Sequence, residues 1–173
     1  MEKFLRIGFL PLVVMLASCA GGYGGDRMAE AVLKPTKGNA TSGTVTFREQ
    51  GNGILVTANV SGLTPGAHGF HIHDKGDCSA PDATSTGGHF NPEGKPHGHP
   101  DHADKHAGDL PQLVADATGN ASLSVMMKGF TIGSGAKNIV GRGLIVHAAA
   151  DDFKTQPTGN SGARLACGVI EAR

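Results

Sequence analysis

Two stretches decide the fold class that this sequence predicts, TVTFR at residues 44–48 and ILVTANV at residues 54–60. Both are rich in the β-branched residues that favour strands. The turn GNG at residues 51–53 lies between them. Two strand-like runs joined by a short glycine-containing turn predict an antiparallel β-hairpin.

The pattern of short strands and turns continues from Ala31 onward. A second hairpin is predicted between residues 112–117 and 121–127, with TGN at residues 118–120 as its turn. Further strands are expected at residues 70–73, 139–147 and 165–170. After the N-terminal segment, no window shows the apolar spacing of an amphipathic helix. We therefore predict an all-β domain, a sandwich or barrel.

Two long segments between the predicted strands contain few apolar side chains. Residues 74–110 are dense in Gly, Pro, His and Asp, and residues 148–163 are mostly polar and turn-forming. Loops of this length inside a compact domain are usually functional or disordered. Because core burial cannot order them, the candidates for doing so are a disulfide and bound metal ions.

The composition narrows the class of protein. A chain of 173 residues favours one domain. Fifteen basic residues balance fifteen acidic residues, so the net charge is zero with neutral histidine. We expect no nucleic-acid partner, because such proteins usually carry a basic excess. The 27 glycines are consistent with many tight turns.

The N-terminus has the pattern of an export signal. Lys3 and Arg6 precede an apolar run at residues 7–16. A charged start followed by about 7–15 apolar residues is typical of a secretory signal. The run is too short to span a bilayer, which takes about 20 residues. LASC at residues 16–19 also resembles the bacterial lipoprotein box, in which the cysteine is acylated.

This pattern divides the chain into three parts. We predict a cleaved signal peptide at 1–18, a flexible tether at 19–30 and a single domain at 31–173. The protein would then lie in the periplasm of a bacterium, tethered to the membrane only through a lipid on Cys19. The alternative is ordinary cleavage nearby, for example after Ala20, which would discard Cys19.

The three cysteines fit this division. If Cys19 carries a lipid, Cys78 and Cys167 remain as a pair. An oxidising compartment would let this pair form a disulfide. The alternative is two buried free thiols.

The nine histidines are concentrated in the middle of the chain. His71 and His73 stand two apart in a predicted strand, so their side chains point to the same face. His147 ends another predicted strand. The first long segment adds three histidines and a carboxylate, namely His89, His97, His106 and Asp109. Imidazole binds copper, zinc, iron and nickel, and zinc also accepts a carboxylate. The spacing predicts one metal site and also indicates a second metal site.

Six segments resemble copper–zinc superoxide dismutase, in order and at matching spacings, over about residues 31–171. They are GFHIH (69–73), GDCS (76–79), GGHFNP (87–92), HAGDL (106–110), GLIVHAAADD (143–152) and GNSGARLACGVI (159–170). The resemblance implies a Greek-key β-barrel or sandwich of about eight antiparallel strands, and an exported bacterial member of the family. It also implies dismutation of superoxide to dioxygen and hydrogen peroxide by a monomer or homodimer with one copper and one zinc per chain.

The resemblance further implies the metal ligands, position by position. Copper would be bound by His71, His73, His89 and His147. Zinc would be bound by His89, His97, His106 and Asp109. His89 would therefore bridge the two metals, and it would act catalytically by taking up and returning a proton.

Two further residues match functional positions of the family. Asp151 matches a carboxylate that joins His71 to His97, and such partners orient metal ligands. Arg164 matches the cation that receives the anionic substrate; the alternative role is a surface salt bridge. A non-enzymatic metal-binding domain is the competing function. It predicts loss of a ligand or of Arg164, whereas every one of these positions is filled here.

Three histidines remain outside this assignment. His68 is expected to be structural. His99 and His102 lie between the expected zinc ligands. One alternative is that both are solvated loop residues. The other is that they bind metal, either as ligands of a surface ion or as substitutes for a zinc ligand when metal is scarce.

Overall fold

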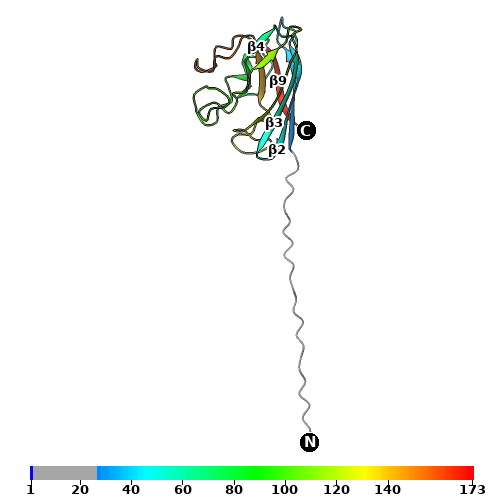
Figure 1. Ribbon diagram of the computed structural model, residues 1–173, viewed down its shortest axis with the longest axis vertical. Helices are drawn as coiled ribbons and strands as arrows, with labels where there is room; N and C mark the ends of the chain where they lie inside the picture. Colours follow the sequence, from blue (N-terminus) through cyan, green and yellow to red (C-terminus); the bar gives the residue numbers. More distant parts are fainter. Residues whose placement is uncertain (2–26) are drawn as a thin grey trace.

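The computed structural model describes Met1 and residues 27–173, and residues 27–173 form an all-β domain with long loops at one side (Figure 1). The strands in this part of the chain are β1 (Met28–Pro35), β2 (Ser42–Gln50), β3 (Gly53–Ser61), β4 (Gly66–His68), β5 (Phe70–His73), β6 (Leu113–Ala115), β7 (Ala121–Met127), β8 (Gly143–His147) and β9 (Arg164–Ala172). One short 3-10 turn, η1 (Thr84–Thr86), accompanies them. The predicted all-β class is confirmed.

The hairpin predicted around residues 51–53 is present as β2 and β3. Gln50 pairs with Gly53, so the connection has two residues, and Gly51 has a φ of 58°, which glycine adopts without strain. Side chains along both strands alternate between the core and solvent, and Val45 and Phe47 are fully buried. The local turn and the apolar alternation therefore suffice to specify this element.

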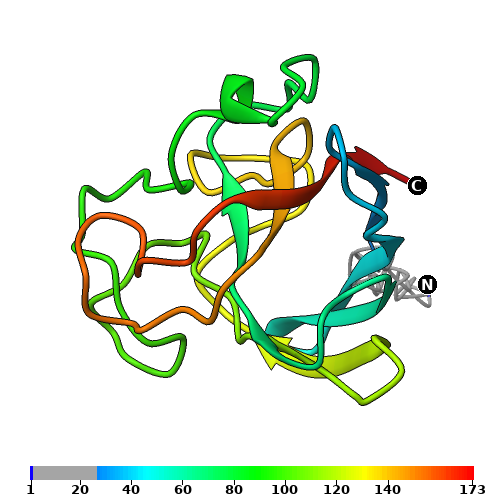
Figure 2. The same ribbon diagram turned by 90° about the horizontal axis from the view of Figure 1, so that it is seen from above.

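The strands form one curled sheet of seven strands in the order β5-β8-β9-β1-β2-β3-β7, and β4 pairs separately with β6. Figure 2 shows how the sheet wraps around the core as a half-barrel. The large side chains inside it come from strands and loops alike, and include Phe47, Phe70, Phe90, Leu110 and Ile139.

The prediction of a second hairpin, between residues 112–117 and 121–127, is wrong. The turn between residues 116 and 120 does form, because the Asp116 N–H donates to the Asn120 carbonyl over 2.9 Å. The flanking strands then separate, since β6 pairs with β4 while β7 pairs with β3. The choice of partner depends on distant segments, which the chemistry of a turn does not encode.

Two predicted boundaries also change. The strand expected at 139–147 begins only at Gly143, because Arg142 N–H donates to the Ile139 carbonyl in a turn. At the other end of the chain, Met28–Glu30 are not part of a tether: Ala29 is fully buried, and β1 pairs with β2 and β9 from its first residues. Residues 2–26, which include Cys19 and most of the predicted signal peptide and tether, lie outside the described residues.

The two long loops run from residue 74 to 112 and from 148 to 163, and they lie on the same side of the sheet (Figure 2). The disulfide between Cys78 and Cys167 attaches the first loop to β9, with a Cα–Cα distance of 5.9 Å. The predicted disulfide is therefore present, and two free thiols are excluded. Within the described residues, no helix has the length and apolar character needed to cross a membrane.

Candidate metal centre

Two groups of side chains under the long loops could each hold a metal ion. The four-histidine group consists of His71, His73, His89 and His147. The Asp109 group consists of His89, His97, His106 and Asp109. In each group all members are buried, and the four possible ligand atoms lie within 4.8 Å of one another. His89 belongs to both groups.

The four-histidine group lies on the face of the sheet opposite the main core. In β5, Phe70 and Ile72 pack into that core, so the alternation of the strand turns His71 and His73 to the other face. His147 comes from the end of the neighbouring strand β8. His89 approaches from the first loop, where it forms an isolated β-bridge with His73.

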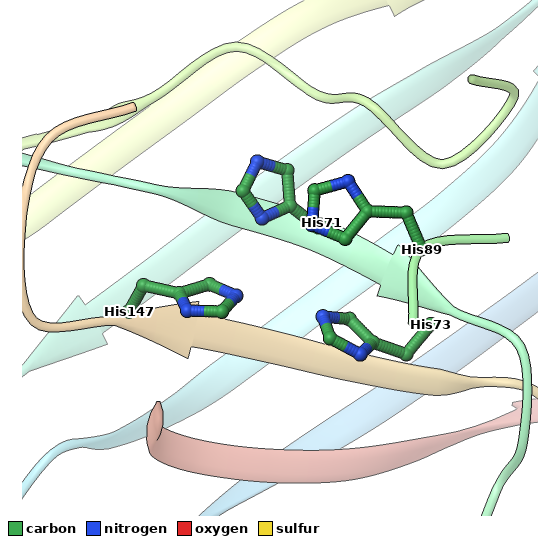
Figure 3. A group of neighbouring side chains, drawn as sticks. All are labelled: His71, His73, His89 and His147. Carbon is green, nitrogen blue, oxygen red and sulfur yellow. The ribbon is translucent and has the colours of Figure 1, made fainter. Parts of the chain in front are cut away.

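The four rings converge on a common space (Figure 3). Ring centroids are 5.0 Å apart for His71 and His147, 5.6 Å for His73 and His147, and 5.2 Å for His73 and His89. One nitrogen of each ring is buried and has no hydrogen-bond partner among the described residues, namely His71 Nδ1, His73 Nε2, His89 Nε2 and His147 Nε2. A buried unpaired polar atom costs about 1–3 kcal/mol, so four together indicate a ligand that satisfies them.

The opposite nitrogens of these rings are hydrogen-bonded, and this determines their tautomers. His73 Nδ1 donates to the Gly87 carbonyl over 2.8 Å, and His147 Nδ1 donates to the Gly162 carbonyl over 3.2 Å. His71 Nε2 donates to Asp151 Oδ2 over 2.6 Å. Because carbonyl and carboxylate oxygens only accept, the unpaired nitrogens carry lone pairs. The donor set therefore fits copper, for which imidazole is a suitable ligand.

Burial keeps these rings in the neutral form that binds metal. It lowers the pKa of His71 and, more strongly, of His73. It also lowers the pKa of His89 to about 4 and that of His147 to about 3. The positive charge of Arg164 is a smaller cause of the lowered pKa of His73 and His147.

In the Asp109 group, one carboxylate oxygen lies between three imidazoles. Asp109 Oδ1 is 2.9 Å from His89 Nδ1, 3.0 Å from His97 Nδ1 and 3.3 Å from His106 Nδ1. The other oxygen accepts the backbone N–H groups of Gly98 and His106. Three imidazole nitrogens and one carboxylate form a donor set that fits zinc.

The charges in the Asp109 group reflect this crowding. Burial opposes ionisation of Asp109, but the close approach of the His106 ring and the hydrogen bonds to His89 and His97 outweigh it and hold the pKa of the carboxyl well below its usual range. Burial likewise opposes protonation of His97, yet the hydrogen bonds to Asp109 and Asp151 raise the pKa of His97 to about 9. The two carboxylates thus favour positive charge at this position, and a bound zinc ion would supply that charge.

Asp151 connects the two groups. Its carboxylate accepts from His71 Nε2 over 2.6 Å and from His97 Nε2 over 2.9 Å. Gly159 packs directly against this bridge, since a Cβ at that position would overlap the Asp151 carboxylate and lie 2.6 Å from His97 Nε2. The structure thus brings Asp151 to the two histidines that the family resemblance assigned to it.

Gln156 is a contact that the sequence analysis missed. Its side-chain oxygen accepts the His97 N–H over 2.8 Å, and its Nε2 donates to the His97 carbonyl over 2.9 Å. The second loop therefore holds the backbone of a candidate zinc ligand at two points. A glutamine in a polar loop carries no local signal of this role, because the contact spans 59 positions.

Arg164 is half-buried beside the four-histidine group, and it forms no salt bridge with any of the described residues. Its guanidinium donates to the Ala83 carbonyl, to Thr86 Oγ1 over 2.8 Å and to the Gly87 carbonyl over 2.8 Å. The same Gly87 carbonyl accepts from His73. These bonds use three of the five N–H groups of the guanidinium.

The remaining histidines lie outside both groups. His68 is buried, and its ring nitrogens lie 2.8 Å from the carbonyl oxygens of His147 and Thr64, so its contacts are structural. His99 and His102 lie on the exposed part of the first loop.

Comparisons with known proteins agree with this geometry. The family model described as copper/zinc superoxide dismutase matches residues 41–170. Superoxide dismutase (Cu-Zn) 2 of Aquifex aeolicus (strain VF5) is 39% identical over 156 residues, which are 87% of this chain and 91% of that protein. The crystal structure of the clock protein EA4 superposes with a TM-score of 0.77 at 39% identity, covering 87% of this chain and 97% of that one. The chain therefore belongs to the copper–zinc superoxide dismutase family.

Proposed function

We propose that the four-histidine group binds the copper, and the Asp109 group the zinc, of this superoxide dismutase. The activity is the dismutation of superoxide to dioxygen and hydrogen peroxide, with copper and zinc as cofactors. The observation that carries the residue assignment is the set of four unpaired, buried imidazole nitrogens next to Arg164, which shares the Gly87 carbonyl with His73.

When bound, copper supplies a one-electron redox couple, by which one superoxide is oxidised and a second is reduced, and zinc supplies a fixed positive charge. His89 can serve both groups, because its Nδ1 faces Asp109 while its Nε2 faces the other three histidines. The Nε2 atom of His89 is also where a proton can be held and passed to the reduced substrate. Asp109 and Asp151 keep the rings oriented for these roles.

Arg164 is suited to receive a small anion. The guanidinium stays charged at neutral pH, and its planar fork binds a diatomic anion better than the point charge of a lysine. The bonds to Thr86 and Gly87 hold it in one position beside His73. Substrate attraction therefore needs no rearrangement of this side chain.

The assignment can be tested by metal analysis and superoxide consumption on the same sample. We expect one copper and one zinc per chain and full activity. A copper-loaded sample without activity would overturn the proposed function. We further expect His89→Ala to impair the binding of both metals and His106→Ala to affect mainly the binding of zinc. Equal loss of copper in the two variants would contradict the bridging role of His89.

We also propose that the chain is exported to the bacterial periplasm, that residues 1–18 are removed and that Cys19 is acylated. The disulfide between Cys78 and Cys167 supports an oxidising compartment. Mass spectrometry of the membrane-bound protein should identify an acylated Cys19 at the new N-terminus. An unmodified N-terminus beyond Ala20 would contradict the lipid anchor. Sedimentation of the soluble domain would distinguish the monomer from the homodimer that the family resemblance implies.

A further inference from the structure

The segment HGHPDHADKH at residues 97–106 contains two histidines that neither buried group uses, His99 and His102. We propose that these two side chains form a third metal site, open to solvent, which binds a divalent transition-metal ion such as Zn²⁺. This site is separate from the copper and zinc sites of the family, and its existence does not depend on the proposed assignment of those sites.

The spacing of the two rings suits one shared ion. The ring centroids of His99 and His102 are 5.5 Å apart. In the two buried groups, the pairs His73–His147 and His97–His106 are each 5.6 Å apart. A pair of imidazoles at this separation can therefore direct one nitrogen each to a common centre after a small side-chain rotation, which the exposed ring of His102 can make.

The backbone holds the two histidines on one turn. The His102 N–H donates to the His99 carbonyl over 2.9 Å, and the Lys95 ammonium donates to the Ala103 carbonyl over 3.0 Å. The His99 ring also packs edge-on against Phe153 of the second loop, with centroids 4.6 Å apart. The turn is thus attached to both loops, so less ordering is needed when a metal binds.

The chemistry around the pair favours a cation. Asp101 lies between the two histidines in the sequence, and its carboxylate is 3.7 Å from His99 Nδ1. It is 87% exposed and free to move toward a bound ion. The Asp101 N–H donates to His99 Nδ1 over 3.3 Å, which holds this ring beside the carboxylate. Two imidazoles and a carboxylate, with water, complete the coordination that zinc accepts.

The location suits the site to metal handling. His99 is two residues beyond His97, and His102 is four residues before His106, so the turn lies between two members of the Asp109 group in the first loop. Those members are buried, whereas His99 and His102 are reached directly from solvent. An ion held on this turn is kept at high local concentration beside the buried group.

The test uses protein whose two buried sites are already filled with copper and zinc. Titration with Zn²⁺ followed by calorimetry should show binding of one additional ion. The double variant His99→Ala/His102→Ala should lose this binding at least tenfold, while Asp104→Ala, which removes an exposed carboxylate of the same turn, should retain it. All three proteins should keep their buried metals.

A direct measurement on the unmodified protein removes any dependence on the variants. In NMR spectra of the metal-loaded protein with the diamagnetic Zn²⁺ added, the ring resonances of His99 and His102 should shift together and saturate with the calorimetric stoichiometry. Absence of additional zinc binding would overturn the proposal. Binding that leaves both rings unshifted, or that the double variant retains in full, would overturn it as well.

Discussion

Replacement of Gly159 by alanine tests whether the Asp151 bridge controls the metal sites. Gly159 has a φ of 66°, and an added Cβ would overlap the carboxylate of Asp151. The carboxylate would have to move away, which would break its hydrogen bonds to His71 and His97. Because these two rings belong to different groups, we expect the affinity for both metals to fall.

The expected magnitude has two parts. An alanine in the left-handed region costs about 1–2 kcal/mol of folding stability. Loss of a carboxylate that orients metal-binding histidines typically lowers metal affinity about 10–100-fold, which corresponds to about 1.4–2.8 kcal/mol. Gly94→Ala isolates the first part, because Gly94 has a φ of 64° and no atom lies within 4 Å of the position of its Cβ.

Chelator competition for copper and zinc, measured on both variants, gives the comparison. Chemical denaturation of the metal-free proteins measures the shared backbone cost. We expect Gly159→Ala to lose at least as much stability as Gly94→Ala, because it also displaces the Asp151 carboxylate, and we expect reduced metal affinity only in Gly159→Ala. If Gly159→Ala binds both metals as tightly as Gly94→Ala does, the Asp151 bridge does not position the ligands.

Three other predictions concern contacts between the loops and the sheet. Gln156→Ala removes both bonds to the His97 backbone, and zinc release to a chelator should accelerate about tenfold; an unchanged rate would show that the contact is dispensable. Cys78→Ser removes a cross-link over 89 residues, so guanidinium denaturation should show that the free energy of unfolding falls by about 4–5 kcal/mol. Wild-type protein whose disulfide has been reduced should show the same loss. Arg164→Ala should lower kcat/KM for superoxide about tenfold or more at unchanged copper content, since a charge-assisted hydrogen bond contributes about 1.5–3 kcal/mol; undiminished kcat/KM would refute this role.

Local patterns predicted part of the fold well. The β2–β3 hairpin follows from a two-residue turn between alternating strands, and the opposite orientations of Phe70 and His71 follow from the period of a strand. The predicted hairpin at residues 112–127 failed although its turn is present, because β6 and β7 pair with different strands. Strand pairing is a non-local choice, and turn chemistry constrains only the residues next to it.

The candidate site shows the same division. The two histidines of β5 and the concentration of imidazoles in the first loop are visible in the sequence, and they already indicate metal binding. The sequence pattern also separates the loops from the strands and, through the family resemblance, supplies a role for each ligand. These features depend on residue type and on spacing within one segment.

Only the tertiary structure decides which segments meet. The pairing of β5 with β8 places His147 beside His71, and the second loop brings Asp151 and Gln156 to the first. The tertiary structure also shows that the Gly87 carbonyl accepts hydrogen bonds from both Arg164 and His73. Contacts between residues so far apart in the chain depend on the order of the strands and on the packing of the loops, because strand order and loop packing together set the distances between remote segments.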